Sequence, residues 1–178
     1  MSKKAGSKLA FKIMALIHDN PLRRKFYKVF STLEDTGLKS GQTVLEVGCG
    51  PGFFTIPAAK IIGEQGKLYA LDIHPLAIES TTLKIKKEKL TNTETVLADI
   101  TNTNFSNNFF DLIFLFGVPR MIRNELFLND LIKESYRILK PKGIISIKTT
   151  NKEIVPKLEK NGFVFQRDKN GIIIFNKS

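Results

Sequence analysis

The apolar residues follow helical spacing in the first part of the chain and form strand-like runs in the rest. Positions i, i+4, i+7 and i+8 of one helical face are occupied by Leu9, Ile13, Leu16 and Ile17. Asn20-Pro21 suits the cap and first position of a second helix, whose apolar stripe continues to Gly37. The pattern therefore predicts two amphipathic helices over residues 1–36, ahead of a main domain over 37–178.

From residue 43 onward, short apolar runs alternate with helical stretches. Strands are predicted at Thr43–Val47, Lys67–Leu71, Thr95–Ala98, Phe110–Phe116, Gly143–Lys148, Phe163–Gln166 and Ile172–Phe175. Helices are predicted at Phe54–Ile62, Pro75–Leu90, Asn124–Leu139 and Lys152–Lys160.

The first five predicted strands are almost continuously apolar, which is typical of a parallel sheet covered on both faces. Their alternation with helices predicts a doubly wound α/β fold, in which ligands bind at the carboxyl ends of the strands. Only residues 167–171 separate the last two strands, so we expect these two to pair as an antiparallel hairpin.

The most informative stretch is the turn after the first predicted strand, which contains Gly48, Gly50 and Gly52. Glycine lets the backbone turn tightly and approach a ligand, and the helix that follows offers N–H groups at its start. Two ligand classes compete for such a turn, a dinucleotide and S-adenosylmethionine. The dinucleotide fingerprint requires a glycine where Phe53 stands, so the pattern disfavours a dinucleotide.

Three carboxylates lie at the ends of consecutive predicted strands. Glu46 is unfavourable beside a pyrophosphate but suits a cationic ammonium or sulfonium group. Asp72 lies 20 residues after Gly52, where a carboxylate can accept hydrogen bonds from both ribose hydroxyls. Asp99 ends the third strand, in a place to accept a hydrogen bond from an adenine amine. One such carboxylate is more often a solvated group or a helix cap, but three in succession after this turn favour S-adenosylmethionine.

With these motifs the sequence resembles the class I S-adenosylmethionine-dependent methyltransferases, especially the small ubiquinone/menaquinone-methyltransferase-like (methyltransferase type 11) branch. The segments that carry the resemblance are Val44–Gly52, Leu71–Ile73, Ala98–Asp99, Phe110–Ile113 and Leu139–Gly143. The resemblance implies a Rossmann-like seven-stranded sheet of order 3-2-1-4-5-7-6 with the last strand antiparallel. It also implies an enzyme that uses S-adenosylmethionine as its methyl donor.

The expected cofactor-binding residues are Glu46, Gly48, Cys49, Gly50, Gly52, Asp72, Ile73, Asp99, Phe116 and Gly117. By the resemblance, the turn at 48–52 lies under the methionine part and Asp72 binds the ribose. Ile73 then flanks the adenine, and Asp99 meets its edge. Phe116 and the residue after it would line the site beside the sulfonium.

The candidates for a catalytic role are His18, Tyr27 and Arg120. Members of the quinone branch often carry Leu-His-His after the fourth strand, where this chain reads Phe-Gly-Val-Pro-Arg-Met over residues 116–121. Arg120 is thus the nearest charged group, suited to binding an anionic substrate. His18 and Tyr27 would face the substrate if the N-terminal helices form a lid over the carboxyl edge of the sheet.

Two further features have structural interpretations. His74 directly precedes Pro75, which is the position of a helix N-cap. Four lysines of the same predicted helix are expected to form a solvated face without a function, namely Lys84, Lys86, Lys87 and Lys89.

Composition and charge narrow the possible partners. With 178 residues, of which 42% are hydrophobic and 25% charged, the chain has the size and composition of one folded domain. The net charge is +11, and residues 1–30 carry +7 of it. This basic N-terminal surface favours contact with RNA, an anionic membrane or an acidic small molecule, or else it only keeps the protein soluble.

Cys49 is the only cysteine, so no internal disulfide can form and a cytoplasmic location is expected. Two separated histidines and one cysteine predict no metal site. We therefore expect a methyltransferase acting on a small molecule. The alternatives are an RNA or protein methyltransferase docked through the basic N-terminus, and a non-catalytic cofactor-binding module.

Overall fold

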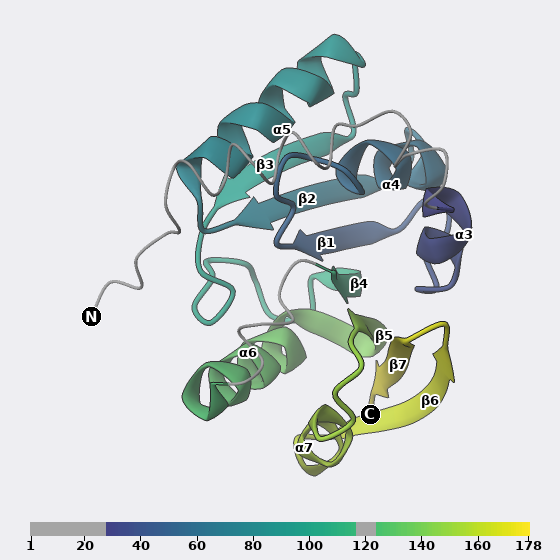
Figure 1. Ribbon diagram of the computed structural model, residues 1–178, viewed down its shortest axis with the longest axis vertical. Coiled ribbons are helices and arrows are strands. Elements are labelled where there is room, and N and C mark those ends of the chain that lie inside the picture. The colour runs from purple at the N-terminus through teal and green to yellow at the C-terminus, as the bar shows by residue number, and fades with distance from the viewer. Residues whose placement is uncertain (1–27, 117–123) are drawn as a thin grey trace.

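The computed structural model describes residues 28–116 and 124–178. These residues form a seven-stranded sheet of order β3-β2-β1-β4-β5-β7-β6 (Figure 1). The strands are β1 Thr43–Val47, β2 Lys67–Asp72, β3 Thr93–Leu97, β4 Phe110–Leu115, β5 Leu139–Lys148, β6 Phe163–Lys169 and β7 Ile172–Lys177. Neighbours from β3 to β5 pair in parallel, whereas β7 runs antiparallel to both β5 and β6. The predicted sheet order, the antiparallel last strand and the C-terminal hairpin are confirmed.

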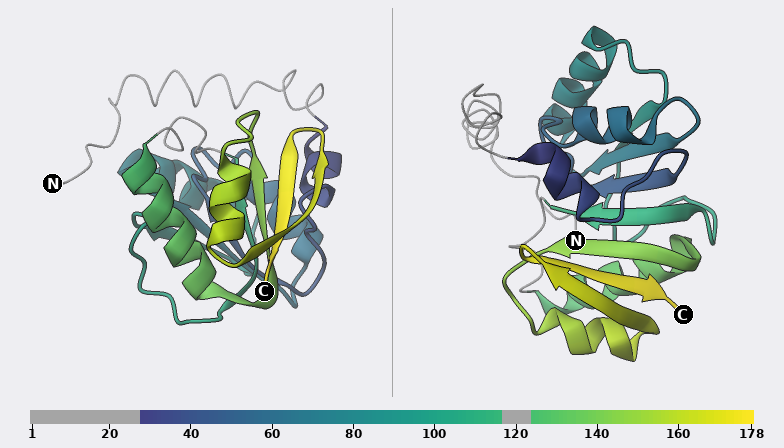
Figure 2. Two further views of the ribbon diagram at one scale, coloured as in Figure 1. Left: turned by 90° about the horizontal axis from the view of Figure 1, so that it is seen from below. Right: turned by 90° about the vertical axis from the view of Figure 1, so that its right-hand side faces the viewer.

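Helices cover both faces of the sheet. They are α3 Val29–Glu34, α4 Thr55–Ile62, α5 Pro75–Lys87, α6 Glu125–Ile138 and α7 Ile154–Lys160. The first three lie on one face and the last two on the other (Figure 2). The arrangement is the expected doubly wound one, because crossovers that lead away from β1 in opposite directions place their helices on opposite faces.

Alternate residues of the central strands face two separate cores. Val44, Leu112 and Phe114 pack towards α3 and α4. Leu45 and Ile113 pack towards α6 and α7. All five are fully buried, which explains why these strands are continuously apolar in the sequence.

Several predicted boundaries are wrong. Strand β3 begins at Thr93 rather than Thr95, and β6 and β7 extend beyond their predicted ends to Lys169 and Lys177. Helix α5 ends at Lys87 rather than Leu90, because Lys89 takes a left-handed conformation with φ 54° and turns the chain towards β3. Strand β5 begins at Leu139 rather than Gly143. The polar residues at its start were not recognised as strand. They lie where the register with β4 shifts, and Lys142 among them has φ 63°.

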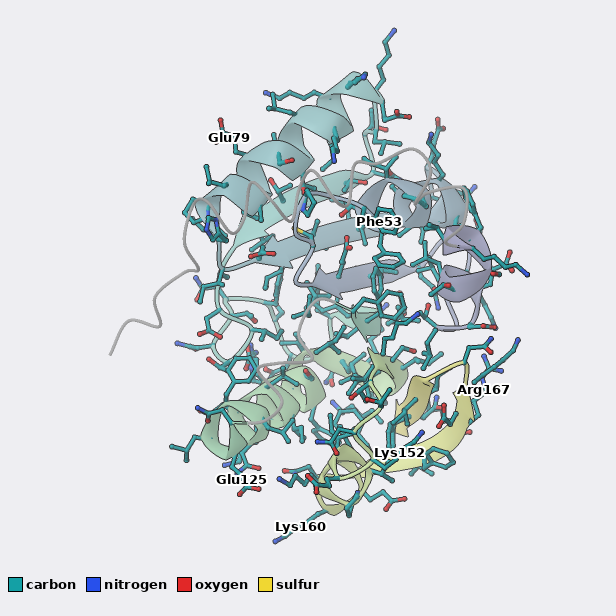
Figure 3. The ribbon with its side chains drawn as sticks, in the orientation of Figure 1. Phe53, Glu79, Glu125, Lys152, Lys160 and Arg167 are labelled. Atoms are coloured by element: carbon teal, nitrogen blue, oxygen red, sulfur yellow. The ribbon has the colours of Figure 1, made fainter. Side chains whose placement is uncertain are left out.

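Helix α3 is the described part of the second predicted N-terminal helix. Its Val29 and Leu33 are buried in the core beside α4. Asp35, at its C-cap, accepts a hydrogen bond from Asn170 at 2.9 Å and pairs with Lys169 at 2.6 Å. Arg167 lies on the same side of the molecule as α3 (Figure 3), and the hairpin of β6 and β7 thus holds the helix end.

The other predicted N-terminal helix lies outside the described residues, so the lid stays a prediction. Within residues 28–116 and 124–178, no helix combines the length and the apolar character that crossing a membrane requires.

Candidate cofactor site

The glycine loop is residues 48–52, between β1 and α4. Gly48, Gly50 and Gly52 have φ values of 78°, 53° and 80°, in a backbone region that residues other than glycine rarely adopt. The N–H groups of Gly48 and Cys49 donate to the carbonyl of Leu71 at 2.8 and 3.0 Å. The loop therefore turns back over the end of β2, as the spacing of its glycines predicted.

Asp72 closes the loop from the end of β2. One carboxylate oxygen accepts from the Gly50 N–H at 2.9 Å, and the other accepts from the His74 N–H at 2.8 Å. Each carboxylate oxygen has a second lone pair, so both can accept a further hydrogen bond from a ligand hydroxyl. The position of Asp72 at the strand end, next to the loop, is the predicted one.

Helix α5 holds the other side of the loop through two residues that sequence reasoning missed. The Thr81 hydroxyl donates to the Gly50 carbonyl at 2.9 Å and is fully buried. The Lys84 ammonium donates to the Pro51 carbonyl at 2.7 Å. The prediction that Lys84 belongs to a solvated face is thus wrong, because its long side chain reaches back to the loop.

A signal for Thr81 exists in the sequence. The buried residues of α5 are Ala77, Thr81 and Ile85, at a spacing of four residues. A hydroxyl on the apolar stripe of a helix needs a hydrogen-bond partner, and the nearby loop supplies it.

Gly52 shows how tightly loop and helix approach each other. A Cβ atom at this position would lie 3.1 Å from the Thr81 hydroxyl oxygen. A side chain at Gly52 would therefore displace Thr81 and strain a backbone whose φ is 80°.

Glu46 in β1 and Cys49 in the loop are both buried acidic groups. Glu46 is 3% exposed, and its carboxyl accepts a hydrogen bond from the buried Thr55 hydroxyl at 2.5 Å. Burial raises the pKa of Glu46 to about 8, opposed by the Thr55 hydrogen bond and assisted by the charge of Asp72. Glu46 therefore holds a proton at neutral pH. Burial also raises the pKa of the Cys49 thiol, which makes this thiol a poor nucleophile.

The loop after β3 carries the third predicted carboxylate. The backbone N–H of Ala98 donates to the Asp72 carbonyl at 3.1 Å, which brings Asp99 to the same edge of the sheet. One Asp99 oxygen accepts from both the N–H and the hydroxyl of Thr101, at 3.0 and 2.8 Å. Ile73 is half-buried at the end of β2. The structure thus gathers the predicted adenosine-side residues along one edge.

Helix α6 fixes the chain that follows Asp99. Glu134 accepts from the N–H and hydroxyl of Thr103 at 2.8 and 2.6 Å and pairs with Arg137 at 2.7 Å. Arg137 also donates to the carbonyls of Phe105 and Thr103. Burial opposes ionisation of Glu134, but the hydrogen bonds from Arg137 and Thr103 prevail and lower its pKa to about 2.

The carboxyl end of β4 contributes an aromatic surface. Phe116 is half-buried, and its ring lies 4.8 Å from that of Phe54 in an edge-to-face contact. Phe54 comes two residues after the glycine loop and is the N-cap of α4. Phe116 therefore adjoins the loop, as expected for a residue that lines the cofactor site.

Gly117 and the three catalytic candidates His18, Tyr27 and Arg120 lie outside the described residues. The predicted N-cap role of His74 is confirmed, because its side chain accepts from the Leu76 N–H at 3.2 Å. In the described part of the chain, no three His, Cys, Asp or Glu side chains gather in a way that could hold a metal ion.

The hydrogen bonds of the loop discriminate between ligands. The N–H groups of Gly48, Cys49, Gly50 and Gly52 all donate within the protein, to Leu71, Asp72 and Cys49. A pyrophosphate binds such a loop through these N–H groups, so the loop does not fit a dinucleotide. The acceptor oxygens of Asp72 fit ribose hydroxyls, and the carboxylates of Asp72 and Asp99 at this edge fit a cationic ligand.

Comparison with known proteins adds an independent observation. The sequence profile of a family described as a methyltransferase domain matches residues 38–173. The chain belongs to this family. The family predicted from the sequence is therefore confirmed.

Two curated relatives and two solved structures are similar to this methyltransferase. The ubiquinone/menaquinone biosynthesis C-methyltransferase UbiE of Escherichia coli O1:K1 / APEC is 32% identical over 136 residues, covering 72% of this chain and 51% of the relative. A demethylmenaquinone methyltransferase of Geobacillus sp. (strain WCH70) is 28% identical over 126 residues, covering 70% and 52%. The chain spans about half the length of these relatives.

The structural likeness extends over nearly the whole chain. A SAM-dependent methyltransferase from Aquifex aeolicus superimposes with a TM-score of 0.81 and 24% identity, covering 98% of this chain and all of that one. The PH0226 protein from Pyrococcus horikoshii OT3 gives a TM-score of 0.80 with 19% identity, covering 97% of this chain and 100% of the other. At these identities the two structures establish the fold of the methyltransferase.

Proposed function

We propose that this methyltransferase transfers a methyl group from S-adenosylmethionine to a small-molecule acceptor, with the cofactor in the crevice formed by the glycine loop, Asp72 and Asp99. The observation that carries the proposal is the inward orientation of the loop N–H groups beside a carboxylate with spare acceptor capacity. Such a crevice favours ribose hydroxyls and a cationic ligand over a pyrophosphate.

Each residue of the site would contact a different part of the cofactor. Asp72 would accept the ribose hydroxyls, with Ile73 against the adenine and Asp99 at its edge. The backbone at Gly48–Gly52 would support the methionine part, and Phe116 with Gly117 would shield the sulfonium. Glu46 would lie near the cationic end of the cofactor. Because its pKa is near 8, it can lose its proton when a positive charge binds nearby.

S-adenosylmethionine, when bound, supplies a methyl group that its sulfonium already activates. The protein then needs to align the acceptor with this methyl group and to exclude water, and such positioning supplies roughly 7–11 kcal/mol in favourable cases. Rigid support of the loop by Thr81, Lys84 and Asp72 serves this alignment. A strong general base is not required for an acceptor that is already nucleophilic.

A small-molecule acceptor is favoured by the UbiE relative, whose name places it in ubiquinone and menaquinone biosynthesis. The basic helices predicted over residues 1–36 would cover the carboxyl edge as a lid and shape the acceptor site. A cytoplasmic location agrees with the single, buried Cys49. Contact of the basic N-terminus with an anionic membrane would bring a lipid-soluble acceptor to the lid.

Label transfer from S-adenosylmethionine carrying a radioactive methyl group tests the proposal. Wild-type protein would be incubated separately with a metabolite pool, a lipid extract and cell RNA. We expect label in the metabolite or lipid fraction, and less label, at a cofactor concentration below saturation, when Asp72→Ala replaces the wild type. Label in RNA would replace the small-molecule acceptor by a nucleic acid, and tight cofactor binding without transfer to any pool would identify a binding module.

A further inference from the structure

We propose that Phe54, Phe116 and Lys148 form an acceptor subsite that selects a planar aromatic molecule with a negatively charged group, and that Lys148 binds this group. This subsite rests on the proposed transfer to a small molecule and defines the chemistry of the acceptor. Strands β4 and β5 bring these side chains together.

The register of β4 and β5 places Phe116 and Lys148 side by side at the carboxyl edge. Leu115 pairs with Ile147; Phe116 directly follows the end of β4, and Lys148 is the last residue of β5. Side chains alternate along a strand, so Phe116 and Lys148 point to the same face as Phe114. On that face the Lys148 ammonium lies 5.8 Å from the centre of the Phe116 ring.

The same surface reaches the glycine loop through Phe54. The rings of Phe54 and Phe116 meet edge to face at 4.8 Å, with an interplanar angle of 76°. Phe54 comes two residues after Gly52 in the chain. The two rings therefore connect the cofactor loop with Lys148. An acceptor bound on them would lie next to the cofactor, as methyl transfer requires.

These rings lie at the margin of the core, packed against it on one side. Phe114 is fully buried, whereas Phe54, Phe116 and Lys148 are only partly buried at the edge of the sheet. A planar ligand can stack on such rings, and an ammonium group has three N–H donors with which to bind an anion in addition to its contacts within the protein. The chain's net charge of +11 also attracts an anionic acceptor over a neutral or cationic one.

Two probes of equal shape test the role of charge. 2-Naphthoate and 2-naphthamide share their ring system and differ in charge. Each would be titrated calorimetrically into the full-length protein saturated with S-adenosylhomocysteine. We expect wild type to bind the naphthoate roughly tenfold more tightly, which is the effect of one hydrogen bond between charged groups.

Variants separate charge from shape. Lys148→Met should remove the preference for the naphthoate, and Lys148→Arg should retain it. Phe116→Leu should weaken both probes by a similar factor, because it removes ring stacking but no charge. Lys142→Met is the matched control on the same strand, since Lys142 is exposed near its opposite end and should leave both affinities unchanged.

The result decides the proposal in either direction. Absence of naphthoate binding, equal affinity for the two probes, or a preference that survives Lys148→Met would overturn it. Failure of the proposed methyltransferase function is detected separately, because S-adenosylhomocysteine would then not bind in the first step of the same titration. The folded state of each variant is checked by its thermal unfolding.

Discussion

The two halves of the carboxyl edge are built from different interactions. In the cofactor half, formed by β1, β2 and β3, individual atoms of the glycine loop are fixed by a hydrogen bond to Asp72 and by hydrogen bonds from Thr81 and Lys84. In the acceptor half, at the ends of β4 and β5, the contacts are between the rings of Phe54 and Phe116 and the side chain of Lys148. Hydrogen bonds are directional and ring contacts much less so, which suits one half to a single ligand and the other to acceptors of varied shape.

Large effects on both cofactor affinity and stability are expected from Gly52→Ala in the cofactor half. Its backbone φ of 80° strains any side chain by about 1–2 kcal/mol, and the new Cβ would displace Thr81. We expect S-adenosylmethionine affinity to fall at least tenfold, by roughly 1.4 kcal/mol. Calorimetric titration measures the affinity, and denaturant unfolding measures the stability.

Gly41→Ala is the matched control for this substitution. Gly41 has φ 79°, and no atom lies within 4 Å of the place that a Cβ would take, so it brings the same strain without the crowding. It should lower the stability by a similar amount and leave cofactor affinity unchanged. Equal loss of affinity in both variants would show that the contact with Thr81 is irrelevant.

Arg137→Ala is expected to break the connection between the halves. Arg137 joins α6 to the loop after Asp99 through Glu134, Thr103 and Phe105. Loss of these hydrogen bonds should reduce the free energy of unfolding by about 2 kcal/mol. Lys133→Ala on the exposed face of α6 should change it by less than about 0.5 kcal/mol.

The same network predicts an acid dependence. Burial opposes ionisation of Glu134, yet hydrogen bonding lowers its pKa from 4.5 to about 2 in the folded state. Its stabilising contribution is therefore complete above pH 4.5 and is lost as the pH falls towards 2. Arg137→Ala should make the acid side of the stability profile flatter, and an unchanged profile would contradict the assignment.

Glu46→Gln tests a pH dependence of stability opposite to that of Glu134, at a buried carboxyl next to the loop. Burial raises the pKa of Glu46 from 4.5 to about 8, so between these values the unfolded state binds fewer protons than the folded state. The contribution of Glu46 to stability then falls as pH rises through this window, by at most about 1.4 kcal/mol per pH unit. The free energy of unfolding of the glutamine variant, measured with denaturant, should lack this decline. If it changes with pH in parallel with that of wild type, the raised pKa of Glu46 is ruled out.

The smallest effect is expected from Thr81→Val, which removes one hydroxyl and keeps the shape. Loss of its hydrogen bond to Gly50 should reduce stability by about 1 kcal/mol and cofactor affinity by a few-fold. Thr82→Val is its neighbour and control, because the Thr82 hydroxyl bonds instead to Thr95 on β3 at 2.9 Å. A loss of affinity in the control as large as in Thr81→Val would mean that the loop does not depend on α5 in particular.

The fold was predictable because its signals are local. Continuous apolar runs mark strands buried on both faces, and Gly48, Gly50 and Gly52 mark a turn that needs positive φ. The boundary errors arose where local and tertiary signals disagree. Polar residues at the start of β5 indicate a loop, yet Leu139 pairs with Phe110 and brings them into the strand.

The positions of the residues in the proposed cofactor half were predictable, and those in the proposed acceptor half were much less so. Asp72 follows from its position at a strand end, whereas the bond from Thr81 to Gly50 joins residues 31 positions apart. Lys148 carries no sequence signal, because a lysine that ends a strand is usually solvated. Its importance depends on the register that places it beside Phe116.

Titration of S-adenosylmethionine into wild type, Asp72→Ala and Asp111→Ala tests the central claim most directly. Asp111 is the matched carboxylate, since it accepts the Thr43 N–H at the opposite edge of the sheet. We predict that one cofactor binds per wild-type chain, that Asp72→Ala weakens binding by about 1–3 kcal/mol, and that Asp111→Ala leaves it unchanged. Equal affinity of wild type and Asp72→Ala, or preferential binding of a nicotinamide dinucleotide, would contradict the assignment of this crevice.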